Sequence, residues 1–427
     1  MNKMWKKIVA LCLICILLCS SVAGCGATSQ SAFKRDEDNP YLLGLCEALI
    51  DTNLTVEPSL TIGYISEAAG ILGIKTYRVW MNFATILTRD PNSNEVLIKE
   101  GAAEAYHKFF AALKENGVER ICAGNSNYLH PYGYDATTHN VVPDPFLEQE
   151  EYLAFLELYQ ESYRVLATEF PEVNYFEPTN EAELTTGQNL CRNGYEWGGS
   201  DNGDYMYTNE ELAHILADLC FYAKQGVQSV NKDNRVLTPA LCAFTTLPDF
   251  LEQIYSAIES GAHPSGQEKA YTNPDSYFDI LNWHPYLLTL SEPEMDENWV
   301  ALQKRIYAVA ENHGDSEKPV WFSEMGFSDR GTYERQEEMA DNVTKMFDYI
   351  DKELPFIETV CFFRLTNLAE ATSTAYENNF GLFYSLLDKD KSVAGQPKPT
   401  AIALYKWFYG EDADLTPLYD FANYKEE

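Results

Sequence analysis

Positive charge is scarce in this sequence. Among its 427 residues, 31 Lys and Arg stand against 65 Asp and Glu, which gives a formal net charge of −34 at pH 7. Nucleic-acid binding depends on clustered basic side chains, and a strongly anionic chain repels anionic membranes and polyanions over long distances. The sequence therefore argues against nucleic acid as a partner and against a polyanionic substrate.

Motifs of several catalytic classes are also missing. After residue 24 the chain has no Cys-x-x-Cys pair and no Cys/His spacing of the kind that binds zinc. It has no Gly-x-Ser-x-Gly, the turn that presents the nucleophile of many serine hydrolases. We therefore expect an activity that needs no metal and no cofactor.

Residues 1–24 have the composition of an export signal. Three lysines in the first seven residues precede an apolar run over residues 8–19, and Val22, Ala23 and Gly24 lead to Cys25. The run is shorter than the roughly 20 residues of a membrane-spanning helix, although an uncleaved anchor helix is the alternative. This end resembles the lipobox of bacterial lipoproteins, in which the cysteine after the cleavage site is lipidated. The resemblance implies a lipid on Cys25, a flexible tether over residues 25–40, and a protein anchored to the outer face of a bacterial cell membrane or secreted.

Cysteines in the rest of the chain favour packing over disulfides. An exported protein could pair its cysteines, but Cys46, Cys122, Cys242 and Cys361 lie in apolar, strand-like runs. A free cysteine in such a run usually acts as a small buried hydrophobic residue. We expect these four to fill the core.

Strand-like and helical patterns alternate along the chain, and no linker rich in Gly, Pro or Ser interrupts them. Runs rich in β-formers predict strands over residues 41–46, 75–81, 118–123, 174–181, 236–244, 277–283, 319–323 and 359–364. Helical spacing of apolar residues predicts helices over residues 62–72, 99–117, 147–170, 209–230, 248–261, 298–312, 335–352 and 399–409.

This alternation predicts an α/β fold with a parallel sheet. Eight strands, each followed by a helix, predict a single (β/α)8 barrel over residues 41–410, with long loops after strands 3, 4 and 8. Residues 411–427 are expected to form a C-terminal tail. The loops over 124–145 and 184–207 would wall a cleft or a pocket, which leaves endo and exo action both open.

Polar side chains gather at the predicted strand ends, where such barrels place their chemistry. They are Arg78, Asn180, Glu181, His284, Tyr286 and Glu324. Retaining cleavage of a glycosidic bond needs a proton donor and a nucleophile about 5 to 5.5 Å apart. The two glutamates could meet this need, with Arg78 and Tyr286 keeping one of them ionised. Arg78 could also be a plain internal bridge, and His284 a core histidine.

The order of these residues resembles the large clan of retaining (β/α)8 glycoside hydrolases, which includes cellulases, mannanases and β-xylosidases. The resemblance rests on Asn180-Glu181 after strand 4, on Glu324 after strand 7, and on Trp283-His284-Pro285-Tyr286, which is similar to the clan's His-x-Tyr after strand 6. It spans about residues 41–410, and Phe380-Gly381-Leu382-Phe383 with Lys398-Pro399 is similar to the clan's run into helix 8.

The resemblance implies a role for each matched residue. Glu181 would be the acid/base and Glu324 the nucleophile, while Asn180 would bind the sugar 2-hydroxyl and Tyr286 and Arg78 would support Glu324. Two positions depart from the clan's pattern. Ala182 follows the acid/base where many members have Pro, and Phe363-Arg364 ends strand 8 where many have Trp.

Other residues near the strand ends are candidates for contact with the sugar. Stacking could come from Trp80, Trp283 or Tyr128, although such residues are more often part of the core than a sugar platform. His130 lies in the aromatic loop after strand 3. We therefore expect a monomeric, lipid-anchored retaining glycoside hydrolase with a carbohydrate substrate. The alternative is a catalytically silent or transport-linked carbohydrate-binding lipoprotein, although binding alone does not need a carboxylate pair.

Overall fold

The structure is a computed structural model that describes residues 33–36, 38–46, 60–90, 92–93, 95–127, 129–131, 141–183, 190, 207–242, 245–261, 271–286, 295–368 and 374–423. The predicted leader, Cys25, Tyr128 and most of the predicted long loops lie outside these residues. Within them, none of the helices combines the length and the apolar character that crossing a membrane requires.

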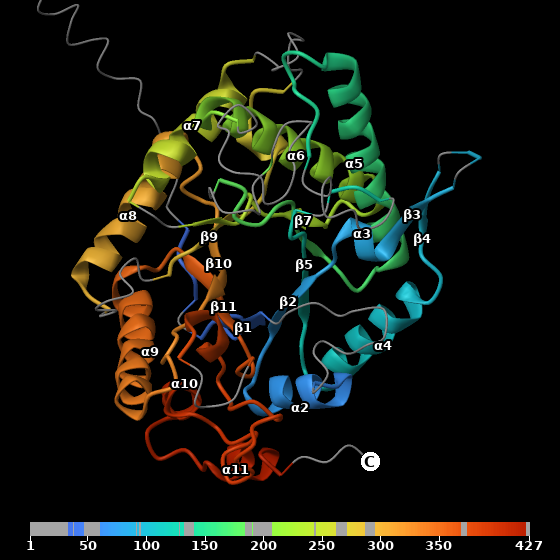
Figure 1. Ribbon diagram of the computed structural model, residues 1–427. Helices are drawn as coiled ribbons and strands as arrows, with labels where there is room; N and C mark the ends of the chain where they lie inside the picture. Colours follow the sequence, from blue (N-terminus) through green and yellow to red (C-terminus); the bar gives the residue numbers. More distant parts are fainter. Residues whose placement is uncertain are drawn as a thin grey trace, which may run out of the picture.

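The centre of the molecule is one curled parallel sheet (Figure 1). Its order is β7-β6-β5-β2-β1-β11-β10-β9-β8. The strands are β1 (Leu43–Cys46), β2 (Thr76–Trp80), β5 (Arg120–Gly124), β6 (Tyr175–Glu177), β7 (Arg235–Val236), β8 (Leu241–Cys242), β9 (Leu281–His284), β10 (Val320–Met325) and β11 (Ile357–Phe363).

The two outermost strands, β7 and β8, are consecutive pieces of the single strand predicted over residues 236–244. Between them Leu237 pairs with Ile280, which precedes β9, and Ala240 pairs with Asn180, which follows β6. Pro239 explains the interruption, because proline has no N–H to donate to a sheet. The sheet thus curls round on itself as in a (β/α)8 barrel.

Helices surround this sheet, and their bounds agree with the predicted ranges to within a few residues (Figure 1). They are α2 (Ile62–Ile71), α4 (Ala102–Glu115), α5 (Gln149–Glu169), α6 (Asn209–Val230), α7 (Leu247–Glu259), α8 (Glu297–Asn312), α9 (Tyr333–Glu353) and α10 (Pro399–Tyr409). Local signals set several ends. Thr208 and Glu211 form a capping box at the start of α6, and Gly117 takes a φ of +91° just after α4.

Several short elements were not predicted. Between β2 and α4 lie α3 (Phe83–Ile86) and an antiparallel hairpin of β3 (Leu87–Arg89) and β4 (Val96–Ile98). Two 3₁₀ turns, η2 (Pro274–Ser276) and η3 (Tyr376–Asn379), and a final helix, α11 (Thr416–Phe421), complete the described chain. The predicted C-terminal tail contains α11, whose Phe421 ring packs 4.5 Å from the ring of Tyr64 in α2.

The described part of the predicted 25–40 tether is held on the barrel. Phe33 packs against the hydrophobic core, and its N–H donates to the carbonyl of Ser316. The Arg35 guanidinium donates to the carbonyls of Ile350, Leu354 and Ile357. One aromatic ring and one guanidinium thus attach residues 33–35 to the barrel, and a flexible tether over residues 25–40 stays a prediction.

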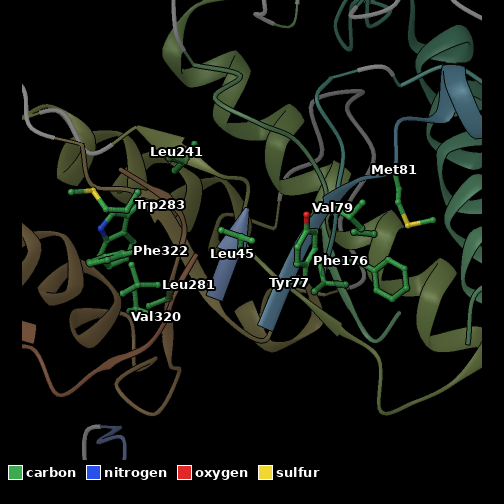
Figure 2. Close-up of a cluster of buried hydrophobic side chains, with 14 of the residues drawn as sticks. Leu45, Tyr77, Val79, Met81, Phe176, Leu241, Leu281, Trp283, Val320 and Phe322 are labelled. Atoms are coloured by element: carbon green, nitrogen blue, oxygen red, sulfur yellow. The ribbon is translucent and has the colours of Figure 1, made fainter. Parts of the chain in front are cut away.

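Alternation along the strands separates two cores. Residues such as Leu45, Tyr77 and Phe176 face the helices and belong to the main hydrophobic cluster, ten members of which are labelled in Figure 2. A small cluster of Cys122, Leu237, Ile280 and Trp321 fills the barrel interior, with Tyr175 packed against it. The five described cysteines, those four predicted to fill the core and Cys220, are buried and unpaired, which confirms the prediction of packing.

Candidate active site

Glu181 and Glu324 meet at the carboxyl ends of the strands. Glu181 lies four residues beyond the end of β6, and Glu324 is in β10. One oxygen of each carboxylate and one ring nitrogen of His284 lie within 4.8 Å of one another. The Glu181 and Glu324 side chains are 18% and 12% exposed. Both carboxylates are therefore accessible to a ligand at this end of the barrel.

The main chain holds Glu181 in an uncommon conformation. Its φ is +49°, in the left-handed region that few residues other than glycine adopt. Its N–H donates to the carbonyl of Ala240 at 2.6 Å, so the segment between β7 and β8 fixes it. Such a conformation costs free energy and is found most often at functional sites.

His284 connects the Glu181 carboxylate to β10. Its Nδ1 lies 2.8 Å from Glu181 Oε1, and its Nε2 lies 3.0 Å from Ser323 Oγ. Burial would raise the pKa of Glu181, but the hydrogen bond and charge of His284 outweigh burial and lower it. Burial lowers the pKa of His284, but the Glu324 charge and the Glu181 hydrogen bond raise it overall. Glu181 and His284 therefore share one proton, and the Glu324 carboxylate lies close to it.

Glu324 receives a hydrogen bond on each carboxylate oxygen. Tyr286 donates its hydroxyl to Oε1 at 2.8 Å, and Arg78 Nη1 donates to Oε2 at 3.0 Å. Burial and the charge of Glu324 raise the pKa of Tyr286, so the phenol keeps its proton and remains a donor. Two donors thus hold the Glu324 carboxylate in place.

Arg78 places a cation in the barrel interior, and its side chain is fully buried. It pairs with Glu177, donates to Asn180 Oδ1 at 2.8 Å, and its Nη1 contacts Cys46 Sγ at 3.0 Å. Burial would lower the pKa of Arg78, but the charges of Glu177 and its other partners raise it. Glu177 is also fully buried and accepts from Asn282 at 2.9 Å, so its role is structural.

Asn180 is positioned from the loop after β5. The Asn127 side chain bonds to both backbone groups of Asn180, accepting from its N–H at 3.0 Å and donating to its carbonyl at 2.6 Å. With the Asn180 main chain held and its Oδ1 bound by Arg78, the side-chain amide has one fixed orientation. Six predicted site residues thus come together: Arg78, Asn180, Glu181, His284, Tyr286 and Glu324.

The two predicted stacking residues that the structure describes, Trp283 and Trp80, are both buried. Trp283 is 2% exposed, packs on Phe322 and donates its ring N–H to Gln303 on the helix side of the sheet. Adjacent strand residues face opposite sides, so the inward placement of His284 requires Trp283 to face outward. Trp80 is buried with the Arg78 guanidinium 4.0 Å from its ring centre.

The remaining predicted contacts are less central. His130 Nε2 lies 2.8 Å from the carbonyl of Val141, and its ring packs on Phe155 of α5. These contacts tie it to its own loop and to α5, and contact with a sugar stays a prediction. Tyr128 lies outside the described residues.

The sequence reasoning missed several supporting residues, among them Asn127, Asn282, Ser323, Cys242 and Glu183. Asn282 and His284 lie on the same face of β9, because alternate residues of a strand face the same side. The sequence pattern could therefore have identified Asn282. Asn127 and Glu183 lie in loops, and Ser323 and Cys242 reach the site through contacts between strands. No local pattern predicts such contacts.

The cluster of Glu181, His284 and Glu324 has the donor types of a metal site, but its donor atoms are already engaged. Glu324 uses one oxygen for Tyr286 and the other for Arg78, and both ring nitrogens of His284 have partners. The Arg78 cation next to Glu324 also disfavours a second positive charge. These contacts favour acid–base chemistry over metal binding.

No protein-family model matches the sequence, and no curated protein matches it. Solved structures do match. A family 39 glycoside hydrolase from the gut symbiont Bacteroides cellulosilyticus WH2 has 14% identity and a TM-score of 0.53, over 88% of this chain and 64% of that one. A family 5 xyloglucan-specific endo-β-1,4-glucanase from a metagenomic library has 13% identity and a TM-score of 0.53, over 87% and 97%.

A β-glycosidase from the hyperthermophile Thermosphaera aggregans has 13% identity and a TM-score of 0.51, over 91% of this chain and 99% of that one. The chain spans less than two thirds of the length of the family 39 enzyme. At these identities the likeness establishes the fold alone: this chain has the barrel fold of solved glycoside hydrolases.

Proposed function

We propose that this chain is a retaining glycoside hydrolase, with Glu324 as the nucleophile and Glu181 as the acid/base. The observation that carries the proposal is the approach of the two carboxylates: one oxygen of Glu181 lies within 4.8 Å of one oxygen of Glu324. Retaining enzymes hold their two carboxyl groups about 5 to 5.5 Å apart, whereas inverting enzymes leave about 6.5 to 9.5 Å for a water. The likeness of the fold to glycoside hydrolases supports the same reading.

In the first step a carboxylate oxygen of Glu324 attacks the anomeric carbon. The bond from this carbon to the leaving oxygen breaks, and that oxygen takes the proton held between Glu181 and His284. Arg78 and Tyr286 donate to the Glu324 carboxylate and hold it in position for the attack. The product of this step is a glycosyl ester of Glu324 and a free alcohol.

In the second step Glu181 acts as the base. It accepts a proton from a water molecule while the water oxygen attacks the anomeric carbon, and Glu324 leaves as a carboxylate. His284 stabilises the ionised Glu181 that this step requires. Two inversions at one carbon give net retention.

We propose a neutral, β-linked polysaccharide or oligosaccharide as the substrate. The chain's net charge of −34 disfavours anionic polymers, and similar solved structures include an exo-β-1,4-mannosidase and a xyloglucan-specific endo-β-1,4-glucanase. We also propose export and anchoring through a lipid on Cys25, on the basis of residues 1–25 alone. Cys25→Ala would then release the protein from the membrane fraction.

The test is hydrolysis of aryl β-glycosides and of plant and microbial polysaccharides by residues 26–427, beside Glu324→Ala, Glu181→Ala and a control, Glu115→Ala, at an exposed site on α4. We expect turnover to collapse in the first two variants and to persist in the control. Azide should restore turnover of an aryl glycoside by Glu181→Ala and give a β-glycosyl azide as the product. That product would identify Glu181 as the acid/base and leave Glu324 as the nucleophile. Binding without turnover across the panel would favour the carbohydrate-binding lipoprotein instead.

A further inference from the structure

Glu183 is a second carboxyl group beside the acid/base. It lies two residues after Glu181, and its Oε1 accepts the backbone N–H of Cys242 at the end of β8. Its Oε2 is shielded from solvent and has no hydrogen-bond partner in the part of the chain that the structure describes. A shielded carboxylate oxygen without a donor favours the protonated form of the acid.

Cys242 links Glu183 to Glu181. Its main chain holds Glu183, while its thiol acts on the Glu181 carboxylate and lowers the pKa of Glu181. Burial and the charges of Glu181 and Glu183 raise the pKa of Cys242, so its sulfur keeps its proton and acts as a donor. One residue thus acts on both carboxyl groups.

The groups that face Glu183 make its charge sensitive to pH. They are Glu181 on its own segment, Cys242 from β8 and His284 from β9. Arg78 from β2 and Glu324 from β10 act on the same cluster through Glu181 and His284. Burial, reinforced by the charge of Glu181, raises the pKa of Glu183 to about 7.

We propose that Glu183 is a positioning residue for the acid/base: held by Cys242, it sets through its own charge the pH range in which Glu181 retains a proton. The inference rests on the proposed function. An ionised Glu183 places a second negative charge near Glu181, and like charges in one site disfavour each other's ionisation. The proton shared by Glu181 and His284 is therefore kept to higher pH when Glu183 is ionised.

The sharpest variant is Glu183→Gln, which keeps the shape and removes the charge. We expect the alkaline limb of kcat/KM for a phenyl glycoside to move down by about one pH unit, with KM unchanged. For a dinitrophenyl glycoside, whose leaving group needs no proton, kcat/KM should stay within about twofold of wild type. The same loss on both substrates at every pH would mean a merely structural role and would overturn the proposal.

Cys242→Ala gives a test of opposite sign. It removes the thiol donor but keeps the N–H that holds Glu183, so the pKa of Glu181 should rise and the alkaline limb should move up. A downward shift or no shift contradicts the linkage. Glu115→Gln, an exposed change on α4, should leave the whole profile unchanged.

A readout without turnover separates this inference from the proposed function. In ¹³C NMR of carboxyl-labelled protein, we expect the Glu183 signal to titrate near neutral pH, and at lower pH in Glu181→Gln, because coupling between two sites is reciprocal. This test remains decisive if Glu183→Gln does not fold. An inactive wild type with the expected NMR shift would reject the glycosidase, whereas an active wild type without that shift would reject the role of Glu183.

Discussion

Arg78 is the residue on which the candidate site depends most. Its guanidinium touches Glu177, Asn180 and Glu324, so one fully buried cation compensates a structural carboxylate and the proposed nucleophile together. A buried charge is tolerated only with such compensation. Gly124 leaves the space for it, because a Cβ there would lie 3.2 Å from both Arg78 Nε and Glu177 Oε1.

Tyr286→Phe tests the second contact of the proposed nucleophile, Glu324. The change removes one hydroxyl, which donates to Glu324 at 2.8 Å, and leaves Arg78 in place. A hydrogen bond to a charged group contributes roughly 1.5–3 kcal/mol, so we expect kcat/KM to fall about 10- to 100-fold. Steady-state kinetics on an aryl glycoside measure this.

The matched control is Tyr41→Phe. Tyr41 lies two residues before β1, remote from the site, and its hydroxyl donates to Glu119 at 2.7 Å. Its kcat/KM should equal that of the wild type. Equal losses in the two variants would show that the effect of Tyr286 is not local.

At the scale of elements, β10 carries the proposed nucleophile and ends against β11. A Cβ on Gly326 would lie 2.0 Å from the carbonyl oxygen of Phe363, so the two strand ends can approach only with glycine there. Behind them, buried Lys398 forms an ion pair with Asp329 at 2.6 Å, which joins the loop after β10 to the start of α10. Backbone contact and one ion pair thus fix the element that holds Glu324.

Gly326→Ala tests this contact. Overpacking of a rigid site costs roughly 1–3 kcal/mol, so we expect a lower free energy of unfolding by that amount and a loss of turnover, because Glu324 lies two residues away. Urea unfolding measures the first effect. Gly101 has a φ of +80°, and a Cβ there would meet nothing within 4 Å. Gly101→Ala therefore measures the cost of a strained backbone conformation without any overpacking.

His313 joins α7 to α8 by charge. Its ring stacks on Tyr255 at 4.5 Å, and its nitrogens lie 2.8 Å from Glu259 and 3.1 Å from Glu252. Burial lowers the pKa of a histidine, but the two carboxylates outweigh burial here and raise the pKa of His313.

A pH dependence of stability follows. A pKa raised in the folded state stabilises the fold fully below the unfolded value of about 6.5, and the gain is lost as pH rises through the folded pKa. His313→Phe keeps the stacked ring, so we expect it to be less stable than wild type at about pH 5.5 and to converge with it at about pH 9. A urea-unfolding difference that is equal at both pH values would refute this.

The whole molecule carries a net charge of −34, and like charges repel one another across the folded surface. Salt shortens the range of this repulsion, from about 30 Å at 0.01 M to about 8 Å at 0.15 M. We expect the Tm to rise between these two salt concentrations, as measured by calorimetry. A Tm that falls would mean that attractive ion pairs outweigh the repulsion.

Most of the architecture was predictable because its signals are local. Apolar spacing predicted α6 over Asn209–Val230, and turn residues marked where strands end. The break between β7 and β8 was missed, although Pro239 signals it. α11 was missed because its sequence has no strong helical pattern, and its packing on α2 is not visible in the sequence.

The sequence by itself determined which residues could carry the chemistry, since Glu181 and Glu324 each end a β-prone run and the alternation of elements implies a barrel. Only the tertiary structure decided how they work together. It set the approach of the two carboxylates within 4.8 Å and the contact of Cys242 with Glu183. It also turned Trp283 away from the site. The physical reason is that periodicity is a property of neighbouring residues, whereas distances between strand ends follow from how the whole sheet curls.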